Sequence, residues 1–323
     1  MTHFEKKRIL ITGHKGFIGS NLVDNLIYNN HTVIGFDNLS TGKYDFLEKS
    51  LLSKNFTLIN GDITNLSDLT QAMKSADFVF HLAANADVRF GTEHVDKDLK
   101  QNTIGTFNVL EAMRSNNIKK IAFSSTGSVY GEAKIIPTPE DAPFPIQTSF
   151  YGASKLAGES LLSAFAEGFD FQVWIFRFVS ILGERYSHGH VYDFYKQLLN
   201  DPTKLAVLGN GKQRKSYLYV GDCIDAIMVA IENANDKVNI LNLGTDEYCE
   251  VNDSIGWINE HLKLKPVLSY SGTERGWIGD NPFIFLDTKK IRNLGWKPNY
   301  TIKEGVIKTI QYLENNQWLL NEK

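Results

Sequence analysis

The sequence predicts an α/β protein: a Rossmann-type doubly wound parallel sheet with a smaller α/β lobe that binds the substrate. Short apolar runs alternate with helical patterns through the first half of the 323 residues, which is typical of βαβ units. A glycine-rich turn, residues 13–19, follows the first apolar run and precedes the first helical pattern. Beyond residue 179 the alternation gives way to longer irregular segments, which we assign to the second lobe.

The glycine-rich turn lies between an apolar run, Arg8–Thr12, that is typical of a buried parallel strand, and an amphipathic stretch, Ser20–Tyr28. Gly13 permits a tight turn, Gly16 allows the backbone to approach a pyrophosphate, and Gly19 lets the helix pack closely on the strand. The phosphate charge then lies at the helix N-terminus. The residues predicted to bind a dinucleotide here are Gly13, Gly16, Phe17, Ile18 and Gly19.

A second strand, Thr32–Phe36, ends in Asp37, about where an acidic residue is expected after such a turn. A carboxylate there accepts hydrogen bonds from both ribose hydroxyls of adenosine and repels a 2′-phosphate. Asn38 follows at a position where an NADP-binding protein would carry arginine, although Lys43 lies a few residues further on. We therefore predict that the cofactor is NAD and that Asp37 and Asn38 bind it.

The alternation continues with predicted strands at residues 56–59, 78–82 and 118–123 and a helix at 102–113. Residues just beyond the carboxyl ends of parallel strands line the ligand crevice of such a sheet. Small side chains at two of these positions leave room for the cofactor. The residues predicted to border the cofactor on this basis are Asp62, Ile63, Leu82, Ala83 and Ala84.

Tyr151 and Lys155 lie four residues apart, so that on a helix they share one face. A tyrosine hydroxyl needs its pKa lowered by roughly 3 units, about 4 kcal/mol, to act as a base near neutral pH. One ammonium about 4 Å away supplies an energy of that order. Two other tyrosine–lysine pairs have the same spacing, but only this pair follows the nucleotide-binding half and a hydroxyl-rich strand end. Thr126 at that strand end can hydrogen-bond a substrate oxygen.

The second half begins with an apolar strand, residues 173–179, and closes with an amphipathic helix at about 302–313. Residues 238–244 are a further apolar strand that we expect to return to the first lobe. We predict an NAD-binding Rossmann domain at 1–178, together with this returning strand. Residues 179–323 would form mainly the substrate-binding lobe.

The composition excludes several classes of protein. A net charge of −3 and a pI near 6.3 give no basic excess for binding nucleic acid or an anionic membrane. Cys223 and Cys249 are the only cysteines, which argues against a disulfide framework and fits a reducing compartment. The first apolar run is too short for a signal peptide or a membrane span, so we predict a soluble, cytoplasmic protein. His188 and His190 have no partners at metal-ligand spacing, so no metal is predicted.

Together these motifs resemble the extended short-chain dehydrogenase/reductase family. Within it they are similar to the nucleotide-sugar epimerases and dehydratases, of which UDP-glucose 4-epimerase is the best-known type. The motifs follow one another in the family's order over nearly the whole chain. They are the glycine pattern, Asp37, Asp62–Ile63, His81–Ala84, Asn102 with Gly105–Thr106, Ser124–Thr126 with Val129–Gly131, and Tyr151–Lys155.

The resemblance implies that Thr126, Tyr151 and Lys155 form a catalytic triad and that Asn102 and Ser124 also contact NAD, as do Tyr151 and Lys155. It further implies a nucleotide-diphosphate-sugar substrate, with a hairpin at residues 207–217 holding the diphosphate. Family members usually dimerise through two helices per subunit, one of which would start at Tyr151. The predicted substrate contacts are Asn85, Thr126, Ser128, Ser180, Lys215 and Arg275.

The expected reaction is epimerisation at C4 of the sugar through a transient 4-keto intermediate. Tyr151, as phenolate, would take the proton of the C4 hydroxyl while hydride passes to the nicotinamide, and the keto-sugar would then turn over and take hydride back on its other face. A net 4-dehydrogenase that releases the keto-sugar and NADH would use the same residues, so this alternative stays open.

Other reactions of the family fit the sequence less well. A 4,6-dehydratase needs an acid and a base immediately after the threonine, where this chain has Gly127 and Ser128. Nucleotide-sugar decarboxylases carry a glutamate where Ser128 stands. A non-catalytic NAD-binding regulator would have a damaged triad, whereas here all three residues are present.

Overall fold

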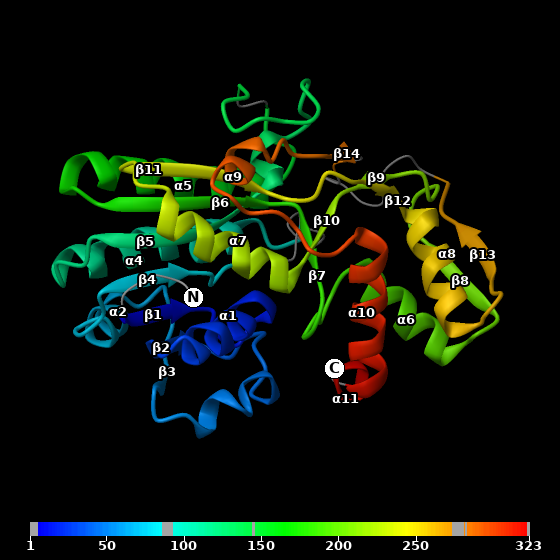
Figure 1. The fold of residues 1–323 in the computed structure, drawn as a ribbon, viewed down its shortest axis with the longest axis horizontal. Coiled ribbons are helices and arrows are strands. Elements are labelled where there is room, and N and C mark those ends of the chain that lie inside the picture. The colour runs from blue at the N-terminus through cyan, green and yellow to red at the C-terminus, as the bar shows by residue number, and fades with distance from the viewer. Residues whose placement is uncertain (1–5, 86–92, 144–145, 273–280, 282, 322–323) are drawn as a thin grey trace.

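The computed structural model describes residues 6–85, 93–143, 146–272, 281 and 283–321, so the predicted phosphate contact Arg275 lies outside the described residues. A seven-stranded sheet in which every neighbouring pair is parallel forms the centre of the larger lobe (Figure 1). Its strands, in spatial order, are β11 (Val238–Leu243), β6 (Gln172–Phe178), β5 (Lys120–Thr126), β4 (Phe78–His81), β1 (Arg8–Thr12), β2 (Thr32–Asp37) and β3 (Phe56–Asn60). This arrangement confirms the predicted fold class.

Strand β1 lies in the middle of the sheet, between β4 and β2. Its apolar residues Ile9, Leu10 and Ile11 are all fully buried, which explains its continuous apolar sequence. The register pairs Thr12 with Phe36 on one side and with His81 on the other. The carboxyl ends of the three strands therefore coincide at one edge of the sheet, where doubly wound proteins bind their ligands.

Helices cover both faces of the sheet (Figure 1). On one face α1 packs against α7, and on the other α2 packs against α4 and α4 against α5. Their apolar sides form two separate cores with the strands. The helices and the short turns between the strands are α1 (Phe17–Tyr28), α2 (Leu66–Ala72), α4 (Gly105–Ser115), α5 (Phe150–Phe169), α7 (Val220–Asn233), α9 (Lys289–Asn293), η1 (Asp45–Leu47), η2 (Ser50–Leu52) and η4 (Gly127–Tyr130).

The smaller lobe has its own apolar core, which includes Phe194, Leu205, Ile258, Val306 and Ile310. Short strands pair in three small sheets, β10–β7, β12–β9–β14 and β13–β8. The elements of this lobe are β7 (Ser180–Leu182), α6 (His190–Asn200), β8 (Lys204–Val207), β9 (Arg214–Lys215), β10 (Tyr217–Tyr219), β12 (Cys249–Glu250), α8 (Val251–Leu262), β13 (Val267–Tyr270), β14 (Phe283–Ile284), α10 (Ile302–Asn315) and α11 (Trp318–Asn321).

The two lobes interleave along the chain. Strand β11 pairs with β6 at the edge of the large sheet, and α7, which also lies beyond residue 178, packs against α1 on the same sheet. The division of the chain at residue 178 stays a prediction. It marks only the first place where the chain passes from the larger lobe to the smaller one, because α7 and β11 return to the larger lobe.

The predicted hairpin at residues 207–217 is wrong. Strand β8 pairs with β13, while β9 pairs with β12 and β14. The two segments of the expected hairpin therefore bond to strands that are distant in the sequence rather than to each other. Partners of this kind cannot be read from a local turn pattern.

Residues 95–115 form a longer helical segment than the predicted helix at 102–113. It begins with α3 (Val95–Asp98), continues as a π-helical stretch, η3 (Leu99–Ile104), and ends with α4. Strand β5 likewise extends beyond the predicted strand at 118–123, so that residues 124–126 belong to the strand.

None of the helices in the described residues is both long and apolar enough to cross a membrane.

Candidate active site

The glycine-rich turn connects β1 to α1 at the carboxyl edge of the sheet. Gly13 has a φ of +74°, and a Cβ built on it would lie 2.6 Å from the backbone nitrogen of Ala83. A Cβ on Gly19 would lie 2.2 Å from the carbonyl oxygen of Gly13, so the helix crosses the turn at close range. Gly16 is the N-cap of α1, and no side chain caps that helix end. This uncapped end behind a tight glycine turn fits the pyrophosphate of a dinucleotide.

Asp37 ends β2 beside the turn. Its Oδ2 accepts a hydrogen bond from the backbone nitrogen of Lys15 (3.3 Å), and its Oδ1 accepts one from Leu39 (2.8 Å). These two bonds hold the carboxylate at the position where a ribose is expected. The residues present therefore fit the adenosine half of NAD.

Asn38 and Asp62 are joined by a hydrogen bond in which Asn38 Nδ2 donates to Asp62 Oδ2 over 2.8 Å. Burial raises the pKa of Asp62, but hydrogen bonds from Thr64 and Asn38 outweigh burial and hold that pKa below its usual value. The two predicted cofactor contacts thus form one polar unit beside Asp37.

The loop after β4 is fixed by its neighbours. The backbone nitrogen of Leu82 donates to the carbonyl of Thr12 (3.1 Å), and that of Ala83 donates to the Thr12 hydroxyl (3.2 Å). Ile63, predicted to border the adenine, is only 5% exposed, and a Cβ on Gly105 would lie 2.6 Å from its side chain. Leu82, Ala83 and Ala84 are half-buried along the cofactor edge.

The structure brings the three predicted catalytic residues together. Thr126 is the last residue of β5, while Tyr151 lies in the first turn of α5 and Lys155 one turn later. The side chains of Tyr151 and Thr126 lie close enough for hydrogen bonding to Thr126 to lower the pKa of Tyr151. Lys155 is buried, and its Nζ donates to the carbonyl oxygen of Ser124 over 2.7 Å. The start of the helix is fixed by the Ser149 hydroxyl, which accepts from the nitrogen of Gly152 at 3.0 Å.

The pKa of Tyr151 is raised, whereas the sequence analysis expected Lys155 to lower it. Desolvation raises the pKa of Tyr151 to about 12, against the hydrogen bond from Thr126, and the charge of Asp98 raises it further. Desolvation lowers the pKa of Lys155 to about 7, whereas the charges of Glu159 and Asp98 act to raise it. In the chain without cofactor, burial therefore outweighs the expected effect of Lys155 on the pKa of the tyrosine.

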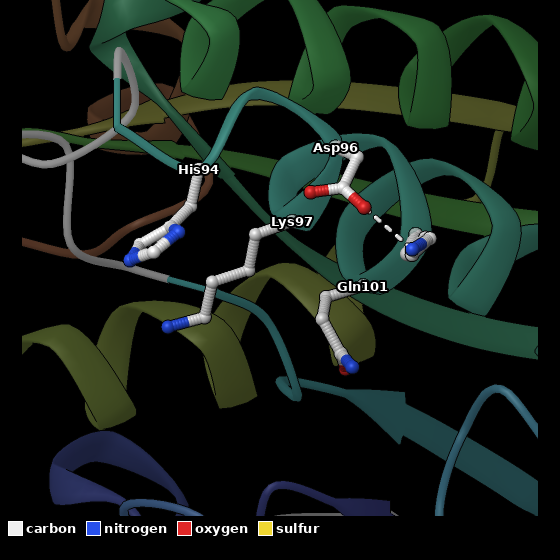
Figure 2. Close-up of a pocket in the computed structure, with 5 residues that line it drawn as sticks. His94, Asp96, Lys97 and Gln101 are labelled. Atoms are coloured by element: carbon white, nitrogen blue, oxygen red, sulfur yellow. Dashed lines mark hydrogen bonds and ion pairs between the residues drawn. The ribbon is translucent and has the colours of Figure 1, made fainter.

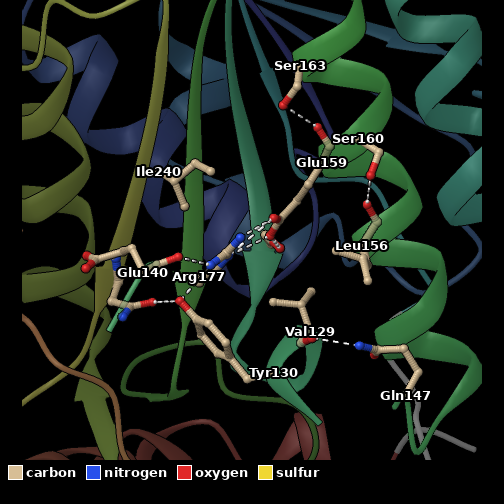
Figure 3. A network of polar contacts seen from close by, with 12 residues as sticks. Val129, Tyr130, Glu140, Gln147, Leu156, Glu159, Ser160, Ser163, Arg177 and Ile240 are labelled. Atoms are coloured by element: carbon tan, nitrogen blue, oxygen red, sulfur yellow. Dashed lines mark hydrogen bonds and ion pairs between the residues drawn. The ribbon is translucent and has the colours of Figure 1, made fainter. Parts of the chain in front are cut away.

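A buried ion pair that the sequence analysis missed anchors the helix of Tyr151 and Lys155 (Figure 3). Glu159, one turn after Lys155, accepts from Arg177 of β6 at 2.7 Å (Nη2 to Oε2), and the two side chains are 4% and 1% exposed. Glu159 also accepts a hydrogen bond from Ser125, the neighbour of Thr126. One carboxylate thus joins α5 to both β5 and β6.

The same network extends to the edge strand of the sheet. Arg177 Nη1 donates to the Tyr130 hydroxyl (2.7 Å) and to the carbonyl of Glu140 (3.0 Å), and Tyr130 donates to Asn242 Oδ1 (2.9 Å) on β11 (Figure 3). Tyr130 is therefore both a core residue and a hydrogen-bonding residue. The one sequence signal was an arginine inside an apolar strand, since a buried charge needs a partner.

Asn85 and Asn102, predicted to contact substrate and cofactor, meet at a third residue, Asp98. Oδ1 of Asp98 accepts from Asn85 Nδ2 (2.8 Å) and from Asn102 Nδ2 (3.1 Å). The Asn102 amide also donates to the Ser154 hydroxyl (3.0 Å), next to Lys155. Asn102 is 1% exposed, so in this structure its side chain holds the loop after β4 against α5.

A surface hollow lies on the outer side of the same helical segment (Figure 2). Asp96 accepts there from Lys100 Nζ at 2.5 Å, and these side chains are 59% and 62% exposed. None of the predicted site residues in the described ranges lines this hollow, so we assign no function to it. The residues that line it are His94, Asp96, Lys97, Lys100 and Gln101.

The remaining predicted substrate contacts lie on separate elements of the two lobes. Lys215 of β9 is half-buried and donates to the carbonyl of Asn281, and Ser180 is exposed at the start of β7. The backbone N–H of Ser128 donates a hydrogen bond to the Thr126 hydroxyl over 3.1 Å.

His190 packs on Tyr217, with ring centroids 4.8 Å apart. Within the described ranges, no group of three or more His, Cys, Asp or Glu side chains is arranged to hold a metal ion.

Comparison with known proteins agrees with this geometry. The model of the NAD dependent epimerase/dehydratase family matches residues 9–244. A putative UDP-glucose 4-epimerase of Methanocaldococcus jannaschii is 34% identical over 316 residues, which cover 95% of this chain and 99% of that protein. Among crystal structures, a UDP-galactose 4-epimerase is 36% identical with a TM-score of 0.86, covering 96% of this chain and 100% of that one.

A second solved structure that is similar to this chain contains NAD. The UDP-glucuronic acid 4-epimerase of Bacillus cereus, in complex with UDP-glucuronic acid and NAD, is 28% identical with a TM-score of 0.88. The alignment covers 95% of this chain and 99% of that one. These matches confirm the predicted family and its NAD dependence. The chain belongs to the NAD-dependent epimerase/dehydratase family and is an NAD-dependent enzyme.

Proposed function

We propose that the protein is a nucleotide-sugar 4-epimerase that acts through a transient 4-keto intermediate. One observation carries the proposal: Thr126, Tyr151 and Lys155 meet at the sheet edge that also holds the glycine turn and Asp37. A hydroxyl pair and a buried lysine beside a dinucleotide site suit the reversible oxidation of a sugar alcohol. Relatives at 34%, 30% and 36% identity support it, since their names are those of UDP-sugar 4-epimerases.

Each residue of the triad has a distinct task. Tyr151 takes the proton of the C4 hydroxyl and later returns it, Thr126 hydrogen-bonds the reacting oxygen, and Lys155 favours the phenolate. Bound NAD supplies the hydride acceptor and a positive charge at the nicotinamide. The buried ion pair of Glu159 with Arg177 keeps the helix of Tyr151 and Lys155 in register with the strand of Thr126.

The residues after Thr126 favour epimerisation over the neighbouring reactions of the family. Gly127 and Ser128 begin the short turn η4, and neither can act as the acid or base that a dehydratase needs. A UDP-glucuronic acid decarboxylase of Danio rerio and a dTDP-D-glucose 4,6-dehydratase of Mus musculus are 29% and 28% identical to this chain. These values are below the 34% of the archaeal 4-epimerase relative.

The proposed substrate is a UDP-sugar, by analogy with the relatives. Its diphosphate would contact Lys215 and Arg275, and its sugar would contact Thr126, Ser128, Asn85 and Ser180. Lys215 carries a positive charge in β9, next to the exposed Arg214. Local cations of this kind can bind a diphosphate although the whole chain carries a net charge of −3.

We further propose that the protein is a homodimer that associates through α4 and α5. The two helices lie side by side on one face of the sheet (Figure 1). Apolar side chains there remain exposed, among them Phe107 (43%) and Phe150 (48%), and Ile104 (44%) just before α4. Light scattering should give twice the mass of the chain, and Phe107→Glu should reduce it to that of the monomer.

The function is tested by incubating the enzyme with NAD and a panel of UDP-, GDP- and CDP-sugars. The C4 configuration of the product and the absorbance of reduced nicotinamide are followed together. Inversion at C4 without accumulation of NADH is the expected result, whereas stoichiometric NADH would indicate the 4-dehydrogenase instead. Tyr151→Phe should abolish turnover while NAD still binds; full activity in that variant would refute the assignment.

A further inference from the structure

Asp98, the last residue of α3, is buried in a way that its sequence context does not suggest. Its neighbours Asp96 and Lys97 are exposed, but Asp98 is only 2% exposed. Its Oδ1 accepts hydrogen bonds from Asn85 and Asn102, whereas its Oδ2 is buried without a hydrogen-bond partner in the described structure. Only one of the two carboxylate oxygens of Asp98 therefore has hydrogen-bond partners among the described residues.

The two hydrogen bonds do not require a carboxylate. The amide oxygen of an asparagine would accept both of them and would leave no buried charge. A buried polar atom without a partner destabilises the fold, and more so when it is charged. The negative charge itself must therefore have a use at this position.

The neighbourhood shows where that charge acts. Asn102 donates to both Asp98 and the Ser154 hydroxyl, which places the carboxylate over the first turns of α5. The charge of Asp98 acts on the ionisation of both Tyr151 and Lys155. Since α3 also packs against α5, Asp98 lies close to the helix that carries the proposed catalytic pair.

The other charged and titratable groups around Lys155 can be followed element by element. On α5, Glu159 is already paired with Arg177 of β6, and the Tyr151 phenol is neutral. On β4, burial and the charge of Lys155 lower the pKa of His81 to about 3, so that ring carries no charge near neutral pH. The strand β5 offers the Ser124 carbonyl and the Phe123 ring, whose centroid lies 4.7 Å from Lys155 Nζ. Glu159 raises the pKa of Lys155 more than Asp98 does, but it is already paired with Arg177. Within the described ranges Asp98 forms no such ion pair, although the charge of the exposed Lys97 also acts on it.

We infer that Asp98 is a positioning residue that acts as the counter-ion of Lys155 and keeps this lysine protonated in its buried site. The inference rests on the proposed function, because that mechanism needs a charged lysine beside the phenol. It also gives Asp98 a second task, since the same carboxylate holds Asn85, a proposed substrate contact, through Oδ1.

The sign of the effect follows from the charges. Removing a negative charge near an ammonium makes loss of its proton easier, so Lys155 should become neutral at a lower pH. The same change makes loss of the Tyr151 proton easier as well. Both limbs of a bell-shaped pH profile should therefore move to lower pH together, which a purely structural defect would not produce.

The test is Asp98→Asn. Because Oδ2 has no partner, this change keeps an acceptor for both hydrogen bonds and removes only the charge. Asp96→Asn is the matched control, since it removes one negative charge from the same helix at a side chain that is 59% exposed. The titration of Lys155 is followed by NMR of protein labelled with ¹³C at lysine Cε, with the signal assigned by its loss in Lys155→Met.

The expected result is that Asp98→Asn moves the titration of Lys155 to lower pH by at least about half a unit, while Asp96→Asn leaves it in place. The inference is overturned if Asp98→Asn leaves the titration unchanged, or if both variants shift it equally. This readout needs no substrate, so it stands or falls separately from the proposed reaction. If the Lys155 shift appears but no nucleotide sugar is turned over, the counter-ion is supported and the epimerase proposal fails.

Discussion

The guanidinium of Arg177 and the carboxylate of Glu159 form a buried ion pair behind the proposed catalytic residues, with 2.7 Å between Nη2 and Oε2. Two further hydrogen bonds, from Arg177 Nε to the two carboxylate oxygens at 3.0 and 3.3 Å, complete the contact. Because Glu159 follows Lys155 by one helical turn and also binds Ser125, the pair fixes the distance between α5 and the end of β5.

Breaking this ion pair should destabilise the fold strongly. Glu159→Met and Arg177→Met each leave an uncompensated charge in the core, and we expect each to lower the free energy of unfolding by about 3–5 kcal/mol. The double variant Glu159→Met/Arg177→Met, with matching apolar side chains, should lose less than the sum. Urea unfolding of the four proteins gives the coupling energy.

The control for this cycle is Glu111→Gln in the more exposed pair of Arg114 with Glu111, where the side chains are 45% and 21% exposed. It should change stability by less than about 1 kcal/mol. If the variants of the buried pair and of the control pair lose equal stability, burial does not have the role given to it here. If the stability lost by the double variant equals the sum of the two single losses, Glu159 and Arg177 do not act as a pair.

Gly13→Ala should disrupt the dinucleotide site. The residue has a φ of +74°, and the added methyl group would lie 2.6 Å from the nitrogen of Ala83, so the turn must move. We expect a loss of stability and at least a tenfold weaker affinity for NAD by calorimetry. Gly256→Ala, in the middle of α8 with no atom within 4 Å of the new methyl group, should instead stabilise the protein by about 0.5–1 kcal/mol.

Asp37→Asn tests the choice between the two dinucleotides. The asparagine can still accept from the nitrogen of Leu39, but it loses the charge that would bind the ribose hydroxyls and repel a 2′-phosphate. Since a hydrogen bond to a charged group contributes about 1.5–3 kcal/mol, NAD affinity should fall about tenfold or more. NADP affinity should rise relative to NAD, as measured by fluorescence titration. Asp45→Asn, at an exposed position in η1, should leave both affinities unchanged.

Local patterns in the sequence predicted the first half of the fold and where several residues of the candidate site lie in it. The glycine turn and Asp37 depend on a strand, a turn and a helix that follow one another directly, so the local pattern was enough to place them. Asp98 escaped prediction because it stands in a charged run, residues 96–98, that looks exposed, and only packing against α5 buries it. The strand partners of β8 and β9 were missed because they lie in distant segments, including 267–270 and 283–284.

The buried Lys155 should make stability depend on pH. Burial lowers its pKa from 10.5 to about 7 in the folded chain. Between these values the unfolded state binds a proton that the folded state does not, so the free energy of unfolding should rise with pH, by at most about 1.4 kcal/mol per unit. Above pH 10 the trend should reverse, because desolvation raises the pKa of Tyr151 to about 12 and folded protein then keeps a proton that the unfolded chain loses.

Urea unfolding of the cofactor-free protein between pH 7 and 10 measures this rise, and Lys155→Met should remove the part due to the lysine. Lys289→Met is the control, because its side chain is 86% exposed and its loss should not flatten the curve. If the slopes of wild type and Lys155→Met coincide, the lysine is not desolvated in the folded chain, and its ammonium does not need the nearby carboxylates to stay charged.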